Sequence, residues 1–211
     1  MNSTGSPCVF IVDDDASIRG AIQGLLKTEN LRSEAFSTTQ EFLRAKRPDG
    51  PSCLVLDVNL PGTSGLDFQK ELIAAGIEIP IIFITGYGDI PMSVKAMKSG
   101  AVEFLTKPFE SQELLNAVQQ ALENDHVLRR NRDQIGGLQE RYATLTARER
   151  DVMRLVVSGR LNKQIAAELA IRLVTVKVHR SQVMRKMQAQ SLAELVRMAE
   201  KLLPPPRNTG V

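Results

Sequence analysis

Short apolar runs that end in polar turn residues recur through the first half of the chain. Val9–Val12, Cys53–Leu56 and Pro80–Ile84 are the most apolar, and weaker runs end at Phe36 and Leu105. Runs of this length are typical of strands buried on both faces of a parallel sheet, although the pattern alone does not exclude a helix. Apolar residues at helical spacing separate the runs. This alternation predicts an α/β doubly wound domain with a five-stranded parallel sheet.

In the second half the apolar residues recur every three or four positions, which predicts helices only. The pair Thr146–Glu149 forms a capping box for the first helix, and Gly159 ends that helix. Asn162 is predicted to cap a second helix, a third starts near Thr175, and a fourth covers 191–203. Two short helices joined by a tight turn, the second rich in basic residues, form a helix-turn-helix. The pattern therefore predicts an all-α four-helix helix-turn-helix domain.

The stretch between the two halves is rich in charged residues. An amphipathic helix is predicted from Ser111, and Gly136–Gly137 is predicted to interrupt it. A segment that contributes to a dimer and a solvated connector fit this stretch equally well. The predicted boundaries are a disordered N-terminus at 1–7, a first domain at 8–123, a partly helical linker at 124–140, a second domain at 141–203 and a disordered tail at 204–211.

The net charge of +3 conceals two halves of opposite sign. Residues 1–123 hold 10 Lys and Arg against 16 Asp and Glu, a net charge of −6, and residues 124–211 hold 17 against 8, a net charge of +9. Only the second half is therefore expected to bind a polyanion. Charge alone does not distinguish nucleic acid from a membrane surface.

Hydropathy and cysteine content indicate a cytoplasmic protein. No run approaches the roughly 20 apolar residues of a membrane span, and the first residues lack the basic and apolar segments of a signal peptide. Cys8 and Cys53 are the only cysteines, which fits a reducing compartment, and both are expected to be buried, inert thiols. We therefore expect no membrane association.

Charged and hydroxyl side chains follow the predicted strands. Asp13 and Asp14 end the first strand, Asp57 the third and Thr85 the fourth, and Lys107 follows the fifth. Because the carboxyl ends of parallel strands meet at one sheet edge, we expect these residues to lie together. Clustered carboxylates repel until a proton or a cation relieves them, and hard oxygen ligands suit Mg²⁺. A carboxylate in this setting can attack phosphorus and form an acyl phosphate. Considered without its neighbours, Asp57 fits an ordinary solvent-exposed residue of a turn.

These residues and their spacing resemble the receiver domain of bacterial two-component response regulators, over about residues 8–123. The motifs that carry the resemblance are Val12-Asp13-Asp14-Asp15, Asp57 followed by Leu60-Pro61-Gly62 and Gly65, Thr85-Gly86, and Lys107-Pro108-Phe109. The resemblance implies a receiver that accepts a phosphoryl group from a sensor histidine kinase and catalyses only its own phosphorylation and dephosphorylation. It is not otherwise expected to be an enzyme.

The resemblance also implies a role for each residue of the site. Asp57 is the phosphoacceptor, and Lys107 binds a phosphoryl oxygen. Asp14, the side chain of Asp57 and the backbone carbonyl of Asn59 hold Mg²⁺, while Asp13 assists through water.

A conformational switch is implied by the same resemblance. Thr85 moves toward the phosphoryl group, and Phe104 swings inward behind it. Without the resemblance, Phe104 fits an ordinary core aromatic residue. A cis Lys107–Pro108 bond is expected from the family.

The second half resembles the LuxR-type four-helix DNA-binding domain over about residues 141–203. The matching motifs are Leu145-Thr-x-Arg148-Glu149-Arg150, Gly159-x-x-Asn162-Lys163-x-Ile165-Ala166, Thr175-Val176-Lys177-x-His179-Arg180 and Leu195-Val196-Arg197. The third helix of this half is then expected in the major groove of DNA. By resemblance, base edges are contacted by Lys177, Val178 and Ser181, and phosphates by Asn162, Lys163, Thr175, Arg180 and Arg172.

The turn before the third helix departs from the family pattern. Arg172 stands where a Ser is usual after the Ile, and Leu173 and Val174 are apolar where polar residues are usual. Two hypotheses for the start of this helix remain open. Thr175 caps the helix and shortens it, or Leu173 and Val174 form an interface patch.

Together the two resemblances indicate the NarL/FixJ family, and the segment Phe83–Gly100 is similar to the FixJ branch. We expect phosphorylation of Asp57 to switch homodimerisation and binding to double-stranded promoter DNA. RNA polymerase is an expected partner, and activation of transcription is the family's commoner outcome.

Two other readings of the chain make different predictions. Asp13-x-Asp15 after a strand is also similar to the haloacid-dehalogenase phosphatase motif, with Asp13 as nucleophile and Asp15 as acid/base, but Ser17 stands where that motif has Thr or Val. The second alternative hypothesis is a receiver joined to an output domain that binds RNA or protein. RNA modules usually present aromatic stacking platforms, and residues 124–211 contain one aromatic residue, Tyr142.

Overall fold

The computed structural model describes residues 5–86 and 90–202. The chain divides into two compact units, one up to Arg129 and one from Arg130. The predicted disordered tail at 204–211, the last residue of the predicted fourth helix and residues 1–4 of the predicted disordered N-terminus lie outside the described residues.

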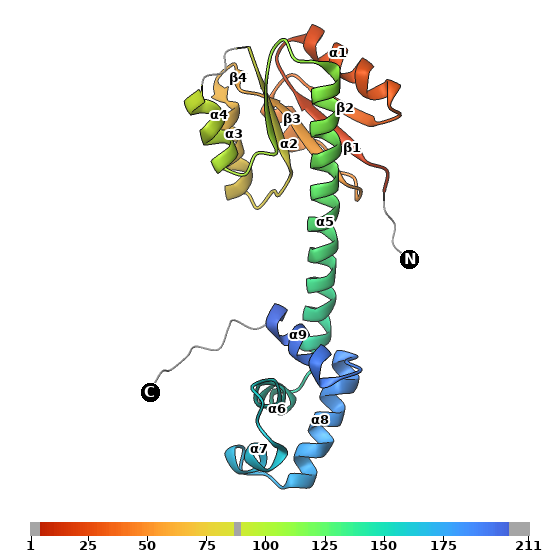
Figure 1. The fold of residues 1–211 in the computed structure, drawn as a ribbon, viewed down its shortest axis with the longest axis vertical. Helices are drawn as coiled ribbons and strands as arrows, with labels where there is room; N and C mark the ends of the chain where they lie inside the picture. Colours follow the sequence, from red (N-terminus) through yellow and green to blue (C-terminus); the bar gives the residue numbers. More distant parts are fainter. Residues whose placement is uncertain (1–4, 87–89, 203–211) are drawn as a thin grey trace. The chain divides into compact units, whose positions relative to one another are not determined.

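The first unit is built on a five-stranded parallel sheet, as predicted (Figure 1). Its strand order is β2-β1-β3-β6-β7. The strands are β1 (Cys8–Val12), β2 (Arg32–Phe36), β3 (Ser52–Asp57), β6 (Ile81–Thr85) and β7 (Glu103–Thr106). A two-stranded hairpin of β4 (Asn59–Leu60) and β5 (Thr63–Ser64) was not predicted. It begins two residues after Asp57 and shapes the loop beside that residue.

Helices cover both faces of this sheet (Figure 1). They are α1 (Ala16–Thr28), α2 (Thr39–Arg44), α3 (Gly65–Ala74), α4 (Ile90–Lys98) and α5 (Ser111–Ala143). The buried side chains of α1 and α5 form one core with one face of the sheet, and those of α2, α3 and α4 form a second core with the other face. The first unit is therefore a three-layer doubly wound domain, and its central strands are apolar except at their ends because neither face meets water.

The prediction that Gly136–Gly137 interrupts α5 is wrong. The helix continues to Ala143, and neither glycine has a positive φ. Glycine in a helix costs about 1 kcal/mol relative to alanine, and good helix formers around the pair offset this cost. Leu138, the next residue, is buried. This packing favours continuation of the helix.

The second unit is all-helical, as predicted. Its helices after α5 are α6 (Ala147–Val157), α7 (Asn162–Glu168), α8 (Leu173–Met187) and α9 (Leu192–Leu202). One core holds them together, with the stripe Val176, Val183 and Met187 of α8 fully buried in it. The predicted capping box is present, because Glu149 N donates to Thr146 Oγ1 at 3.3 Å and Thr146 N donates to Glu149 Oε2 at 2.8 Å.

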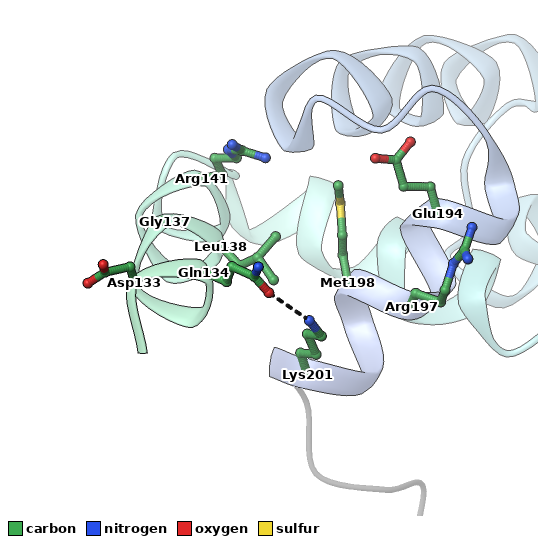
Figure 2. Close-up of a pocket in the computed structure, with 9 residues that line it drawn as sticks. All are labelled: Asp133, Gln134, Gly137, Leu138, Arg141, Glu194, Arg197, Met198 and Lys201. Carbon is green, nitrogen blue, oxygen red and sulfur yellow. Dashed lines mark hydrogen bonds between the residues drawn. The ribbon is translucent and has the colours of Figure 1, made fainter. Parts of the chain in front are cut away.

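The last turns of α5 lie against α9 within this unit. Lys201 Nζ on α9 donates to Gln134 Oε1 at 3.3 Å. A pocket of about 430 Å³ lies beside this contact (Figure 2). Its lining residues are Asp133, Gln134, Gly137, Leu138, Arg141, Glu194, Arg197, Met198 and Lys201.

Two predicted helix starts in the helix-turn-helix are wrong. Asn162 does not cap α7 but is its first residue, and its Oδ1 accepts a hydrogen bond from Arg180 Nη1 at 3.0 Å. Gln164 Oε1 accepts from the backbone N–H of Leu161 instead, at 2.8 Å. Thr175 does not cap α8, since the helix starts at Leu173. Helix α8 therefore begins three residues earlier than a cap at Thr175 would allow.

A buried ion pair links α6 to α8. Lys186 Nζ lies 2.6 Å from Glu149 Oε2, and the Glu149 side chain is buried. Burial alone raises the pKa of Glu149. The hydrogen bonds from Lys186 and Thr146 outweigh burial and hold the pKa below its ordinary value of 4.5. Glu149 therefore stabilises the second unit in its ionised form.

Because the folded-state pKa is lowered, the stabilisation from Glu149 is present above about pH 4.5 and is lost as the pH falls through the folded pKa. Glu149→Gln keeps a side chain able to cap α6 but loses the charge. We therefore expect the free energy of unfolding to fall by about 1 to 2 kcal/mol at pH 7. Urea unfolding of the full chain at pH 7 and pH 4, followed by circular dichroism, measures this. The exposed Glu200→Gln serves as control, and an equal effect of the two substitutions would refute the assignment.

Candidate functional site

Four strands end at the edge of the sheet where the predicted site residues lie. Asp57 is the last residue of β3 and pairs in register with Ile84 of β6. Thr85 ends β6 and pairs with Thr106 of β7, immediately before Lys107. Asp13 follows the last residue of β1. The parallel topology therefore brings residues far apart in sequence to one edge.

Three carboxylates meet at this edge, as predicted. One oxygen from each of Asp13, Asp14 and Asp57 lies within 4.8 Å of the others. Asp13 and Asp57 are buried, whereas Asp14 is exposed. A cluster of hard oxygen ligands open to solvent on one side fits Mg²⁺, which keeps several waters. The residues present therefore suit a Mg²⁺ site.

Lys107 is the cation that faces this cluster. Its Nζ lies 2.6 Å from Asp13 Oδ2 and 3.0 Å from Asp57 Oδ2. The bond between Lys107 and Pro108 is cis, as predicted. One ammonium facing three carboxylates leaves excess negative charge. A divalent cation can neutralise this excess.

The pKa values of the pair follow from burial and contact. Burial raises the pKa of Asp13 above its ordinary value of 3.8, although hydrogen bonds from Lys107 and from the Asp15 backbone oppose the rise. Burial alone lowers the pKa of Lys107, but Asp13 and Asp57 outweigh it, so the pKa lies above 10.5. Lys107 is therefore charged at neutral pH.

Asp15 has a structural role next to the cluster. Its Oδ1 caps α1 by accepting from Ser17 N at 2.7 Å and from Ile18 N at 3.4 Å. These hydrogen bonds lower the pKa of Asp15 below 3.8. A carboxylate held ionised as a helix cap is poorly suited to donate a proton, so this geometry opposes the phosphatase reading with Asp15 as acid/base.

Thr85 is connected to the Asp57 loop by a contact that was not predicted. Asn59 Nδ2 donates to Thr85 Oγ1 at 3.1 Å, and Asn59 N donates to Asp57 Oδ1 at 3.1 Å. The predicted role of Asn59 involved only its backbone carbonyl. The side chain of Asn59 thus joins the hydroxyl of Thr85 to the loop that carries the candidate phosphoacceptor.

Phe104 lies on β7, next to Phe83 of β6. The two ring centroids are 6.4 Å apart with an interplanar angle of 47°. Phe104 is half-buried and packs against the core below α2, α3 and α4. It does not belong to the carboxylate cluster, and its role as a switch stays a prediction.

A buried network at the opposite end of β3 was missed in the sequence. Asp125 Oδ2 on α5 accepts from Ser52 N at 2.8 Å and from Arg129 Nε at 2.5 Å, and Arg129 Nη2 donates to Ser52 Oγ at 3.2 Å. The only sequence signal was an Asp and an Arg four residues apart, which is common on solvated helices. The network attaches α5 to the strand that ends in Asp57.

The predicted base-contacting residues share one face of α8. Lys177, Val178 and Ser181 are exposed, on the side opposite the buried stripe of Val176 and Val183. An exposed face on the second helix of a helix-turn-helix is the surface that enters a major groove.

The predicted phosphate contacts divide into three groups. Lys163 and Arg172 are exposed. Arg180 and Asn162 are half-buried and bonded to each other, so part of their hydrogen-bonding capacity is used within the unit. Thr175 is half-buried in the first turn of α8.

No helix within 5–86 and 90–202 is both long and apolar enough to cross a membrane.

Comparisons with known proteins match both units. A family model described as the response regulator receiver domain matches residues 9–119, and one described as bacterial regulatory proteins of the luxR family matches residues 143–199.

Similar proteins align over almost the whole chain. Nodulation protein W of Bradyrhizobium diazoefficiens is 53% identical over 92% of this chain and 86% of its own length. Transcriptional regulatory protein FixJ of Azorhizobium caulinodans is 42% identical over 90% of each chain. The solved structure of response regulator StyR has a TM-score of 0.82 and 47% identity, and the match covers 93% of this chain and all of that one.

Proposed function

Because the chain belongs to the NarL/FixJ family of response regulators, which join a receiver domain to a LuxR-type DNA-binding domain, we propose that phosphorylation of Asp57 controls its binding to promoter DNA. A receiver domain implies a sensor histidine kinase as partner. The observation that carries the proposal is the position of Asp57, buried at the end of β3 among carboxylates and 3.0 Å from Lys107.

In the proposed transfer, a carboxylate oxygen of Asp57 forms a bond to phosphorus, and the bond from phosphorus to the phosphohistidine nitrogen of the kinase breaks. The imidazole nitrogen that leaves takes up a proton, and Asp57 becomes an acyl phosphate. Lys107, positioned by Asp13, stabilises the negative charge of a phosphoryl oxygen.

Asp14, Asp57 and the backbone carbonyl of Asn59 are the proposed ligands of Mg²⁺, with Asp13 assisting through water. When bound, Mg²⁺ supplies positive charge that neutralises the phosphoryl oxygens. The convergence of the three carboxylates within 4.8 Å supports this assignment. Apart from its own phosphorylation and dephosphorylation, the receiver has no proposed catalytic activity.

The proposed switch starts at Thr85. Its hydroxyl accepts a hydrogen bond from Asn59 Nδ2. When Thr85 moves so that this hydroxyl hydrogen-bonds a phosphoryl oxygen, the contact with Asn59 breaks. Movement of Thr85 leaves space into which Phe104, on the neighbouring strand, turns inward. Phosphorylation thereby favours one of two pre-existing arrangements of α4 and β7.

Dimerisation is the proposed consequence of this switch. Ile90, Val94 and Met97 on α4 are large apolar side chains exposed to solvent. A second copy of the receiver can bury them, and a dimer presents two DNA-binding domains to two half-sites. We place the chain in the cytoplasm, with RNA polymerase as a further partner and activation of transcription as the outcome.

Sedimentation of the full chain tests this switch. With Mg²⁺ and beryllofluoride, which imitates the phosphoryl group, we expect a dimer, and without beryllofluoride a monomer. Asp57→Asn is expected to stay monomeric in both conditions, and the exposed Asp67→Asn to behave as wild type. Equal masses of wild type with and without beryllofluoride would refute the dimer switch.

DNA binding should separate two kinds of contact. We expect Lys177→Ala to cost about 1 to 3 kcal/mol at the preferred site and to relax base preference, because Lys177 lies on the exposed face of α8. Lys163→Ala should weaken binding to every duplex. It should also reduce the slope of log affinity against log salt concentration by about one. Fluorescence anisotropy across a salt series measures both. Equal loss on specific and random duplexes for Lys177→Ala would contradict its role.

A further inference from the structure

The first two turns of α8 expose apolar side chains to water. Val174 is 62% exposed and Val178 is 54% exposed. Both lie in the helix, because α8 starts at Leu173. Exposed valines lower helix propensity relative to alanine, and these two bury only part of their side chains within the unit. Their packing within the DNA-binding unit therefore does not account for them.

The two valines form a row with a polar continuation. Residues four apart lie on the same face of a helix, so Val174 stands one turn before Val178, and Ser181 continues the row. This row lies opposite the buried Val176 and Val183. It therefore occupies the middle of the face that points away from the core.

The surroundings of this row are basic. Lys177 lies on the same exposed side, and Arg172 immediately precedes the helix and is exposed. A protein interface of ordinary size has an apolar centre from which lysine is depleted, and a row of two valines beside Lys177, with Leu173 38% exposed at the start of the helix, is too small to provide one. A partner that combines anionic groups with small, separate apolar groups fits better.

The major groove of double-stranded DNA has this chemistry. Its phosphates attract the basic residues, and the C5-methyl of thymine is an apolar group at a base edge. Apolar side chains near the N-terminus of a recognition helix are placed to contact such methyl groups.

We propose that Val174, together with Val178, contacts thymine methyl groups in the operator, so that this chain selects thymine at the positions under the first two turns of α8. The proposal rests on the proposed function of α8 as the DNA-reading helix. It adds a base preference and assigns Val174 as a specificity residue.

The test removes the methyl group and the valine separately and together. A preferred duplex is first selected from random sequences by the full-length chain with Mg²⁺ and beryllofluoride. Each thymine of that duplex is then replaced in turn by deoxyuracil, which lacks the methyl and keeps every hydrogen-bonding group. Binding is measured for wild type, Val174→Ala, Val178→Ala and Val127→Ala. Val127 is a control on α5, 48% exposed.

We expect the uracil substitution to weaken wild-type binding about fourfold at the thymines under α8, the change expected for one buried methyl. For Val174→Ala, one of these thymines should become insensitive to uracil, and for Val178→Ala a different one. Val127→Ala should keep the full wild-type pattern. Alanine raises helix propensity, so α8 stays formed in these variants.

Two results overturn the proposal in distinguishable ways. If selection yields a preferred duplex but Val174→Ala leaves the effect of uracil unchanged at every thymine, the methyl contact is wrong and DNA reading by α8 stands. If selection yields no preferred duplex, the proposed function fails, and the methyl contact fails with it.

Discussion

Replacing Asp57 by asparagine is expected to abolish uptake of a phosphoryl group from acetyl phosphate in the presence of Mg²⁺. A carboxamide lacks the anionic oxygen that forms the acyl phosphate, and it weakens the Mg²⁺ site by one charge. We expect the rate of uptake to fall by at least about 100-fold. Intact-protein mass spectrometry measures it, because each phosphorylated chain gains the mass of one phosphoryl group.

The matched control for this prediction is Asp15→Asn. Asp15 lies in the same region but caps α1, and asparagine caps helices about as well as aspartate. The control should therefore fold and take up phosphoryl groups as wild type does. Retained uptake in Asp57→Asn, together with loss in Asp15→Asn, would favour the phosphatase reading instead.

Replacing Lys107 by methionine is expected to destabilise the receiver when Mg²⁺ is absent. Lys107 bridges the buried carboxylates of Asp13 and Asp57, and its own side chain is only 17% exposed. Removal of the ammonium leaves these charges uncompensated, which we expect to lower the free energy of unfolding by about 3 kcal/mol. Urea unfolding with a chelator, followed by circular dichroism, measures this change.

Added Mg²⁺ should stabilise Lys107→Met more than wild type, because the ion then supplies the missing positive charge. Lys70→Met removes an exposed ion pair with Asp67 and should change the free energy of unfolding by less than about 1 kcal/mol. A Lys107→Met chain as stable as wild type in chelator would show that Lys107 does not balance the cluster.

The sheet and the carboxylate cluster were predictable because local and global signals agree there. Strands buried on both faces read as continuous apolar runs, and parallel pairing brings their carboxyl ends to one edge. Asp13, Asp57, Thr85 and Lys107 could therefore be placed together without a structure. Their clustering indicated a Mg²⁺ site and a carboxylate able to form an acyl phosphate, whereas the separate role of each residue followed only from the resemblance.

Features that depend on a tertiary partner were not predictable. Asn162 is a good cap by residue type, but Arg180, eighteen residues later, holds its side chain in a different contact. Asp125 and Arg129 look like a solvated helix pair until Ser52 is placed beside them. In each case the missing information was a contact distant in sequence.

The start of α8 was missed for a different reason. The sequence predicted a start near Thr175 and left open whether Thr175 caps the helix, but α8 begins after Arg172, and no side chain caps it within the described part of the chain. Buried Val176 fixes the helix against the core, and that packing outweighs the absent cap, which is worth about 1 kcal/mol.

The proposed switch requires that Asp57, and no other carboxylate of the cluster, carries the phosphoryl group. The most direct measurement is to phosphorylate the wild-type chain with acetyl phosphate and Mg²⁺, reduce the acyl phosphate with borohydride, and locate the reduced residue by peptide mass spectrometry. We expect reduction at Asp57 alone. Reduction at Asp13 would contradict this expectation.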